Sequence, residues 1–198
     1  MSEISKDFVK RESEYIKMGQ ELSRLYYEMS CKDKDGNLHA YNLISRYYAG
    51  KFADRSGVPY INHIDEGLTV LGYIDADIDT QAAYCLHPLF QSDGDLLISS
   101  KNMIKFENIK YKQLIYVMEY RNIANAYLSP RKIESISEIN LSPIQQVNDM
   151  LIADKIQNYK DFLKYHDGHV RWKELNLYFL NWFKRLDVDH KKLMELIE

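Results

Sequence analysis

The apolar residues of this 198-residue chain recur at helical spacing along almost its whole length. The clearest run covers three turns and consists of Leu175, Tyr178, Phe179, Trp182, Phe183 and Leu186. Such spacing places side chains on one face of an α-helix, whereas a half-buried strand alternates at every second residue. The sequence contains no convincing alternating segment and no internal repeat. The pattern therefore predicts an all-α fold.

Short segments rich in turn-forming residues divide this pattern into separate helices. Breaks are expected at residues 32–37, 55–59, 93–95 and 167–168. Each combines a glycine with charged, polar or proline residues, which favour turns. In the first segment Gly36 can adopt a positive φ. In the third, the two aspartates that flank Gly94 are expected as loop formers.

Two further helices can be placed from their own residues. One should extend to Phe52, because one helical face would carry Leu43, Ile44, Tyr47, Tyr48 and Phe52. The other should begin with Ser142 as N-cap, Pro143 at the first helical position and Gln145 at the capping-box position. It should end near Lys164, and its inward residues should include Val147, Leu151 and Phe162.

Composition excludes several classes of protein. The net charge of −3 gives no electrostatic footprint for duplex nucleic acid, and 28% charged residues with only 4 prolines exclude a disordered or collagen-like chain. Cys31 and Cys85 cannot form a disulfide framework, which favours reduced thiols. No apolar stretch approaches the roughly 18 residues of a membrane span, and residues 1–21 lack a signal-peptide core. We expect a soluble, cytoplasmic protein that binds no membrane.

Three polar residues stand in apolar surroundings that could bury them. His63 follows the break at 55–59, His87 ends an apolar run, and Asp154 lies within a helix of mostly apolar residues. A buried histidine satisfied by a carbonyl group, or an aspartate held in an ion pair, would explain each residue without any function. Asn158 lies one turn after Asp154 and should project from the same face.

The order of the segments around these residues resembles the HD-domain superfamily, specifically the hydrolase domain of the RelA/SpoT type and its small stand-alone relatives. The resemblance covers residues 38–188 and rests on four stretches: R-S-G-V-P-Y-I-N-H at 55–63, Q-A-A-Y-C-L-H at 81–87, L-I-A-D-K-I-Q-N at 151–158 and Y-F-L-N-W-F at 178–183. It implies an HD-domain helical bundle at residues 38–190, preceded by a helical extension at 1–37 and followed by a tail at 191–198.

The resemblance implies a divalent metal, commonly manganese and otherwise zinc or magnesium, held by His63, His87 and Asp154. The aspartate of the family's His-Asp pair is replaced by Pro88. The family's acidic pair, which helps to activate water, falls at Gln91 and Ser92, with Asp93 as a weak substitute next to them. On the nucleotide side, the resemblance assigns binding roles to Arg55, Asn158 and, more loosely, Arg121.

These replacements affect the chemistry more than ligand binding. Two histidines and one carboxylate still form a minimal metal site with open positions, although binding no metal stays an alternative. Loss of the acidic pair removes general-base help, which is typically worth about 10²–10⁴-fold in rate. The sequence therefore favours a degenerate HD-domain protein that binds a nucleotide or another phosphorylated ligand with weak or no hydrolysis.

Two alternatives stay open. An active metal-dependent nucleotide pyrophosphohydrolase would use His63, His87 and Asp154, with Arg55 and Arg121 holding phosphates. A non-enzymatic interaction platform would instead bind a protein partner or a second copy of the chain, which the 16 tyrosines make plausible because tyrosine is enriched at interfaces. The helix expected in the first 30 residues could serve either to cap the core or to contact such a partner.

Overall fold

The computed structural model describes residues 36–54, 56–102, 109–126, 133 and 135–198. Its elements in chain order are α2 (Gly36–Tyr48), α3 (Ile61–Tyr73), α4 (Ile78–Leu86), η1 (His87–Phe90), α5 (Asp93–Asn102), α6 (Tyr111–Ala126), η3 (Ile136–Glu138), α7 (Gln145–Tyr165), α8 (Trp172–Leu186) and α9 (His190–Met194). Within these ranges no strand occurs, and the all-α prediction is confirmed. The helix expected in the first 30 residues lies outside the described part.

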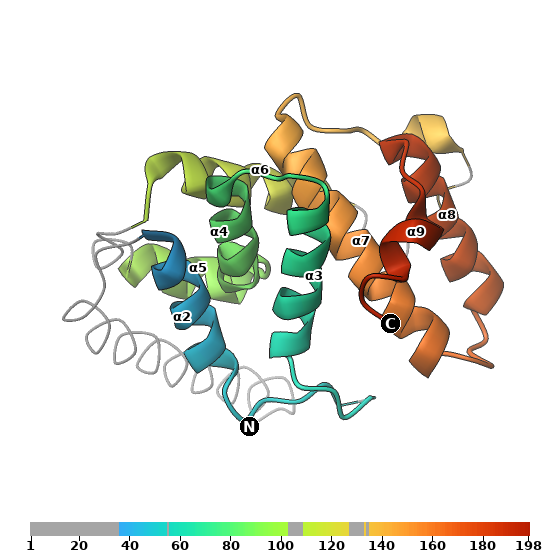
Figure 1. The fold of residues 1–198 in the computed structure, drawn as a ribbon, viewed down its shortest axis with the longest axis horizontal. Helices are drawn as coiled ribbons and strands as arrows, with labels where there is room; N and C mark the ends of the chain where they lie inside the picture. The colour runs from blue at the N-terminus through green and yellow to red at the C-terminus, as the bar shows by residue number, and fades with distance from the viewer. Residues whose placement is uncertain (1–35, 55, 103–108, 127–132, 134) are drawn as a thin grey trace, which may run out of the picture.

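Helix α7 runs through the middle of the described structure, between α3 on one side and α8 and α9 on the other (Figure 1). It packs against α3, α4, α6, α8 and α9. Every residue from Met150 to Gln157 is buried, polar residues included. The predicted inward residues Val147, Leu151 and Phe162 are buried as expected. Any polar side chain in the centre of α7 must therefore find its partners inside the protein.

The start of α7 differs from the prediction, whereas its end agrees. The helix begins at Gln145 rather than Ser142, with Ile144 as its N-cap. Asn148 holds the extended approach to the helix, because its side chain pairs with both the N–H and the carbonyl of Ser142 at 3.0 Å. The Ser142 hydroxyl accepts from the N–H of Ile144, before the helix begins. After Tyr165 the chain turns, and Gly168 has a φ of 77°, as expected of a break.

Three other local predictions need correction. Helix α2 begins at Gly36, so this residue is helical and not part of a turn. The same helix ends at Tyr48, and Phe52 lies outside it, 55% exposed, in an isolated bridge with Pro59. Residues 93–95 form the first turn of α5 instead of a loop. Aspartates are favourable there because the N-terminus of a helix carries partial positive charge.

Buried Asp79 fixes α4 against the start of α6. Its carboxylate accepts hydrogen bonds from Lys110 and Gln113 at 2.8 Å and pairs with Lys112. Burial alone would raise the pKa of Asp79, but these donors lower it to about 2. This contact orients the helix whose end carries His87.

The C-terminal residues are part of the helical fold. Residues 191–198, expected as a tail, include most of α9, whose Leu193 and Met194 are buried and which packs against α7. Among the described helices, none is both long and apolar enough to cross a membrane.

Candidate metal centre

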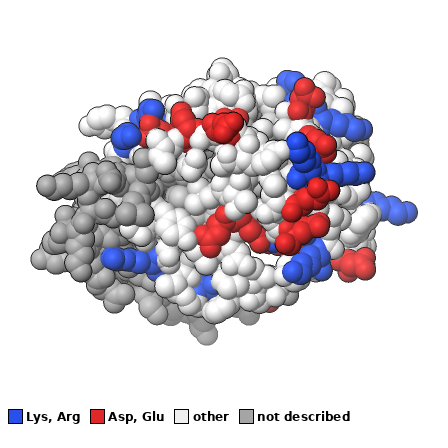
Figure 2. All heavy atoms as spheres, viewed as in Figure 1, with Lys and Arg blue, Asp and Glu red and all other residues white. Residues whose placement is uncertain are grey.

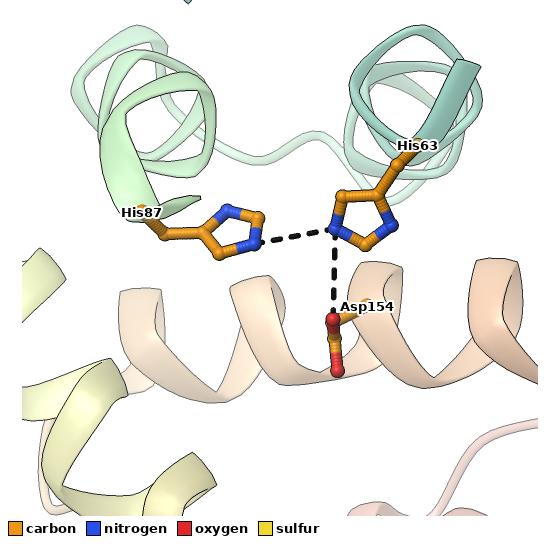
Figure 3. Close-up of side chains that lie close together, drawn as sticks. All are labelled: His63, His87 and Asp154. Carbon is orange, nitrogen blue, oxygen red and sulfur yellow. Dashed lines mark hydrogen bonds and ion pairs between the residues drawn. The ribbon is translucent and has the colours of Figure 1, made fainter. Parts of the chain in front are cut away.

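His63, His87 and Asp154 meet in the core although 91 residues separate the first from the last. His63 lies in the first turn of α3, His87 follows α4 directly, and Asp154 lies in the middle of α7 (Figure 3). The two Nε2 atoms are 3.2 Å apart, and Nε2 of His63 is 3.7 Å from Oδ1 of Asp154. One ligand atom from each residue lies within 4.8 Å of the others. The structure thus brings together all three predicted metal ligands.

His87 is positioned by the end of α4. The α-helix stops at Leu86, and Pro88 lies in the first turn of η1, so the proline ends the helix as its chemistry predicts. The imidazole lies between the rings of Tyr84 and Tyr120, with centroids 4.8 and 4.9 Å away. Its Nδ1 is 2.6 Å from the carbonyl oxygen of Tyr84.

This carbonyl contact determines how the ring of His87 can act. A carbonyl oxygen only accepts, so Nδ1 carries the hydrogen and Nε2 of the neutral ring has a free lone pair. Burial, together with the neighbouring His63, lowers the pKa of His87 to about 3, and the ring is therefore neutral near pH 7. Its lone pair faces His63, and His87 can serve as a metal ligand through Nε2.

Asp154 is ionised although it is buried. Burial raises its pKa, but Lys155 and the two histidines lower it to about 2. Lys155 donates to Oδ2 at 2.9 Å, and Asn158 donates to Oδ1 at 2.8 Å, as expected for a residue one turn further along the helix. Oδ1 is the oxygen that lies beside His63, and besides the hydrogen bond from Asn158 it can accept one more partner through its second lone pair.

The histidines also contact groups that the sequence did not single out. Nδ1 of His63 is 2.7 Å from Oε1 of Gln157. The buried Tyr84 hydroxyl donates to the carbonyl of His63 at 3.2 Å and thereby ties α4 to α3. One sequence signal could have identified the polar face of α7, because Asp154, Gln157, Asn158 and Asp161 follow the helical spacing i, i+3, i+4, i+7. These four residues share one side of a helix whose centre is otherwise apolar apart from Lys155.

The three ligand candidates open onto a pocket of about 480 Å³. Its lining includes Tyr48 and Tyr60, whose ring centroids are 5.4 Å apart, and the acidic side chains of Asp95 and Asp161. Among the described residues that line it, Lys155 is the only lysine or arginine. On the face shown in Figure 2, lysines and arginines are interspersed with acidic residues and form no continuous basic patch.

Some of the predicted nucleotide-side and catalytic residues line this pocket, and others do not. Asn158 and Gln91 line the pocket, as does Pro88. Arg121 pairs with Asp93, whose side chain is 98% exposed, and neither residue lines the pocket.

Two other predicted residues have different outcomes. The Ser92 hydroxyl accepts from the N–H of Asp95 at 3.0 Å and donates to its Oδ2 at 2.5 Å, so Ser92 caps α5. Arg55 lies outside the described residues. Of the two aspartates near the lost acidic pair, Asp95 rather than Asp93 faces the pocket.

The donor set fits a divalent cation. Ligand atoms bound at about 2.0–2.1 Å to a tetrahedral zinc ion lie about 3.3 Å from one another. The separations of 3.2 and 3.7 Å are close to this value, while the third pair, His87 and Asp154, lies within 4.8 Å and would have to move closer when a cation binds. Two imidazoles and one carboxylate are ligands of zinc and of other divalent transition metals, and three protein ligands leave at least one position open.

No protein-family model matches this chain, and neither a curated protein nor a solved structure matches it. The HD-domain resemblance therefore rests on the four sequence stretches alone.

Proposed function

We propose that this chain is an HD-like protein that binds a divalent cation through His63, His87 and Asp154, and through that cation a nucleotide or another phosphorylated ligand. The observation that carries the proposal is the convergence of two imidazole Nε2 atoms and one carboxylate oxygen from three separate elements. This convergence occurs at the floor of a pocket large enough for a small ligand.

The charge of the pocket explains why a cation comes first. Lys155 is already paired with Asp154, while Asp95 and Asp161 add negative charge to the lining. An anionic ligand is therefore disfavoured until a cation binds. A divalent cation would supply positive charge and open coordination positions for phosphate oxygens. The neighbouring rings of Tyr48 and Tyr60 offer aromatic faces on which a nucleobase can stack.

Weak or absent hydrolysis follows from the groups available to take up a proton. At the positions of the family's acidic pair, Gln91 has an amide, which is not a base, and Ser92 caps a helix. Asp95 lines the pocket, but its Oδ2 is held by the Ser92 hydroxyl. Binding with little turnover is therefore the activity that we propose.

Metal binding is tested by dialysis against Mn²⁺ or Zn²⁺, followed by elemental analysis and titration calorimetry. The wild type should retain about one equivalent, and His87→Ala should lose it. His190→Ala is the matched control, because His190 stacks on Phe183 away from the centre and should leave the stoichiometry unchanged. Absence of metal from the wild type, or equal loss in both variants, would show the proposal to be wrong.

Ligand binding is tested on the same samples with ppGpp, GDP and pyrophosphate. We expect binding that requires the cation and is lost in His87→Ala, with little change in the phosphorus-31 spectrum over hours. Rapid turnover abolished by Asp154→Ala would instead establish a working hydrolase. If neither cation nor nucleotide changes the melting temperature, the interaction platform becomes the better interpretation.

A further inference from the structure

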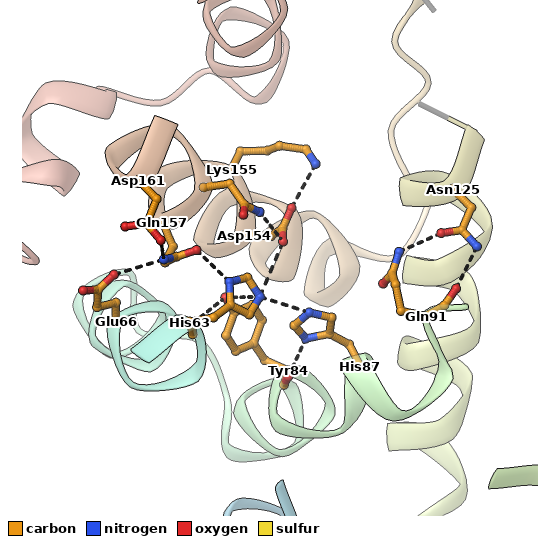
Figure 4. A network of polar contacts seen from close by, with 11 residues as sticks. His63, Glu66, Tyr84, His87, Gln91, Asn125, Asp154, Lys155, Gln157 and Asp161 are labelled. Carbon is orange, nitrogen blue, oxygen red and sulfur yellow. Dashed lines mark hydrogen bonds and ion pairs between the residues drawn. The ribbon is translucent and has the colours of Figure 1, made fainter. Parts of the chain in front are cut away.

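We infer that Gln157 is a positioning residue, which holds His63 as the tautomer with hydrogen on Nδ1 and thereby turns the Nε2 lone pair toward His87 and Asp154. The inference deepens the proposed function and rests on it, because it explains how the imidazole of His63 is oriented to bind a cation. It rests on contacts at Nδ1 of His63, the ring nitrogen that does not face the other ligand candidates. Neither His87 nor Asp154 takes part in these contacts (Figure 4).

Gln157 is buried in α7, and its side-chain amide contacts His63 through the oxygen and two carboxylates through the nitrogen. Its Oε1 lies 2.7 Å from Nδ1 of His63. Its Nε2 donates to Oδ2 of Asp161 at 2.7 Å and to Oε2 of Glu66 at 3.2 Å. The side chain is only slightly exposed, with 2% of the residue's surface accessible, so water does not replace these partners.

The two carboxylates decide which way the amide faces. An ionised carboxylate only accepts hydrogen bonds, so the NH₂ group of Gln157 must point toward Glu66 and Asp161. The amide oxygen must then point toward His63, and because this oxygen also only accepts, Nδ1 of His63 must carry the hydrogen. The neutral ring consequently has its lone pair on Nε2.

Lys160 keeps the two carboxylates together. Its Nζ pairs with Oε1 of Glu66 and lies 3.2 Å from Oδ1 of Asp161. The lysine thus bridges two like charges that would otherwise separate. A neutral amide suits position 157, since a third carboxylate there would face Glu66 and Asp161.

The consequence appears at Nε2, the other nitrogen of the His63 imidazole. The carbonyl of Tyr84 gives His87 the same tautomer by an independent contact. Two Nε2 lone pairs then face each other at 3.2 Å beside Oδ1 of Asp154. This arrangement favours a cation between them. With its hydrogen on Nε2, His63 would instead donate to His87 and could not bind a metal through that atom.

The first measurement is the tautomer of His63, read from long-range proton–nitrogen correlations in the metal-free protein. We expect hydrogen on Nδ1 in the wild type and in Gln157→Glu, which keeps an acceptor for Nδ1 although its second oxygen would face Glu66 and Asp161 and should lower the stability of the fold. Gln157→Met keeps the size of the side chain but removes the acceptor, and its His63 should move to the Nε2–H tautomer.

The second measurement is Zn²⁺ affinity. Loss of a group that orients a metal-binding histidine typically costs about 10- to 100-fold, and we expect that loss in Gln157→Met but not in Gln157→Glu. Gln113→Met is the matched control, because Gln113 is also buried and bonded to a carboxylate, that of Asp79. It should lower stability without changing Zn²⁺ affinity or the His63 tautomer.

The outcomes separate this inference from the proposed function. An Nε2–H tautomer in the wild type overturns the inference even if Gln157→Met fails to fold. An unchanged tautomer in folded Gln157→Met overturns it as well. If the tautomer shifts as expected but the wild type binds no Zn²⁺, the positioning role stands and the cation site is wrong. Equal loss of Zn²⁺ affinity in the Glu and Met variants would indicate general destabilisation and count against positioning.

Discussion

Lys155 places a positive charge in the core, which among the described residues is compensated by Asp154, by the side chain of Tyr178 and by the ring of Trp182. Its Nζ lies 2.9 Å from Oδ2 of Asp154 and 5.3 Å from the ring centroid of Trp182, and the side chain is 5% exposed. Because both charges are removed from water, each is tolerated mainly through the other. The lysine therefore keeps the carboxylate of Asp154 ionised. Loss of either residue would leave the other charge buried without its partner.

Removing the lysine should be costly. We expect Lys155→Met to lower the free energy of unfolding by about 3–5 kcal/mol, because an unpaired carboxylate stays buried. The double variant Asp154→Asn/Lys155→Met should recover part of this loss. Lys192→Met, which removes an exposed lysine over the ring of Tyr73, should change stability far less than Lys155→Met does. Urea unfolding at pH 7 measures all three values.

The stability lost in Lys155→Met should depend on pH in one definite direction. In the wild type the pKa of Asp154 is lowered to about 2, so its stabilising contribution is present above the unfolded pKa of about 3.9 and is lost as the pH falls further. Without Lys155, burial raises the folded pKa above the unfolded value, so the destabilisation should grow as the pH rises above about 4. A loss of stability that is equal at pH 4 and pH 7 would contradict this account.

The sequence pointed to the ligand candidates but not to the groups that orient them. His63, His87 and Asp154 could be found because histidine and aspartate are conspicuous among apolar neighbours, and because three of the four stretches that carry the family resemblance contain them. Gln157 was missed because a glutamine on a long helix is usually exposed. Its importance depends on Glu66, which lies 91 residues away in sequence and is brought beside it only by the packing of α3 on α7.

At the scale of elements, α3 and α4 approach closely at Gly67. The ring and hydroxyl of Tyr84 occupy the space where a side chain at position 67 would begin. This close approach allows the hydroxyl to reach the carbonyl of His63. The glycine is therefore explained by packing, since its φ is not in the left-handed region.

Gly67→Ala should separate the two helices. The new methyl group would overlap with Tyr84, and overpacking of this kind typically costs about 1–3 kcal/mol. Gly72→Ala, on the same helix but with nothing within 4 Å of the added Cβ, should be neutral or stabilise by up to about 1 kcal/mol. Thermal unfolding compares the two variants, and equal effects would show that Gly67 has no special packing role.

Helix boundaries were predicted well where the residues at the boundary favour only one conformation. Helix α7 ends just before Asp167-Gly168, as predicted, because Gly168 takes a positive φ. Prediction failed where the same residues suit two conformations. Gly94 with its flanking aspartates is typical of a turn, but aspartate also favours the first turn of a helix, which is where these residues lie in α5.

At the scale of the whole molecule, the candidate centre joins elements that are distant in sequence. His63 comes from the start of α3, His87 from η1 and Asp154 from the middle of α7. Helices α8 and α9 lie beyond α7 from this centre and supply no ligand candidate (Figure 1). A cation bound there would tie α3, η1 and α7 to one another directly and affect α8 and α9 only through α7.

A bound cation should therefore slow amide hydrogen exchange more in some elements than in others. At a Zn²⁺ concentration of about 100 times Kd, binding adds roughly 2.7 kcal/mol to the stability of the native state. In hydrogen exchange followed by mass spectrometry, we expect the largest added protection at residues 61–67, 84–90 and 150–158, and less in α9. Openings that keep the centre intact do not release the cation, so their exchange should stay unchanged. His87→Ala should show no added protection, whereas a gain in that variant would place the cation elsewhere.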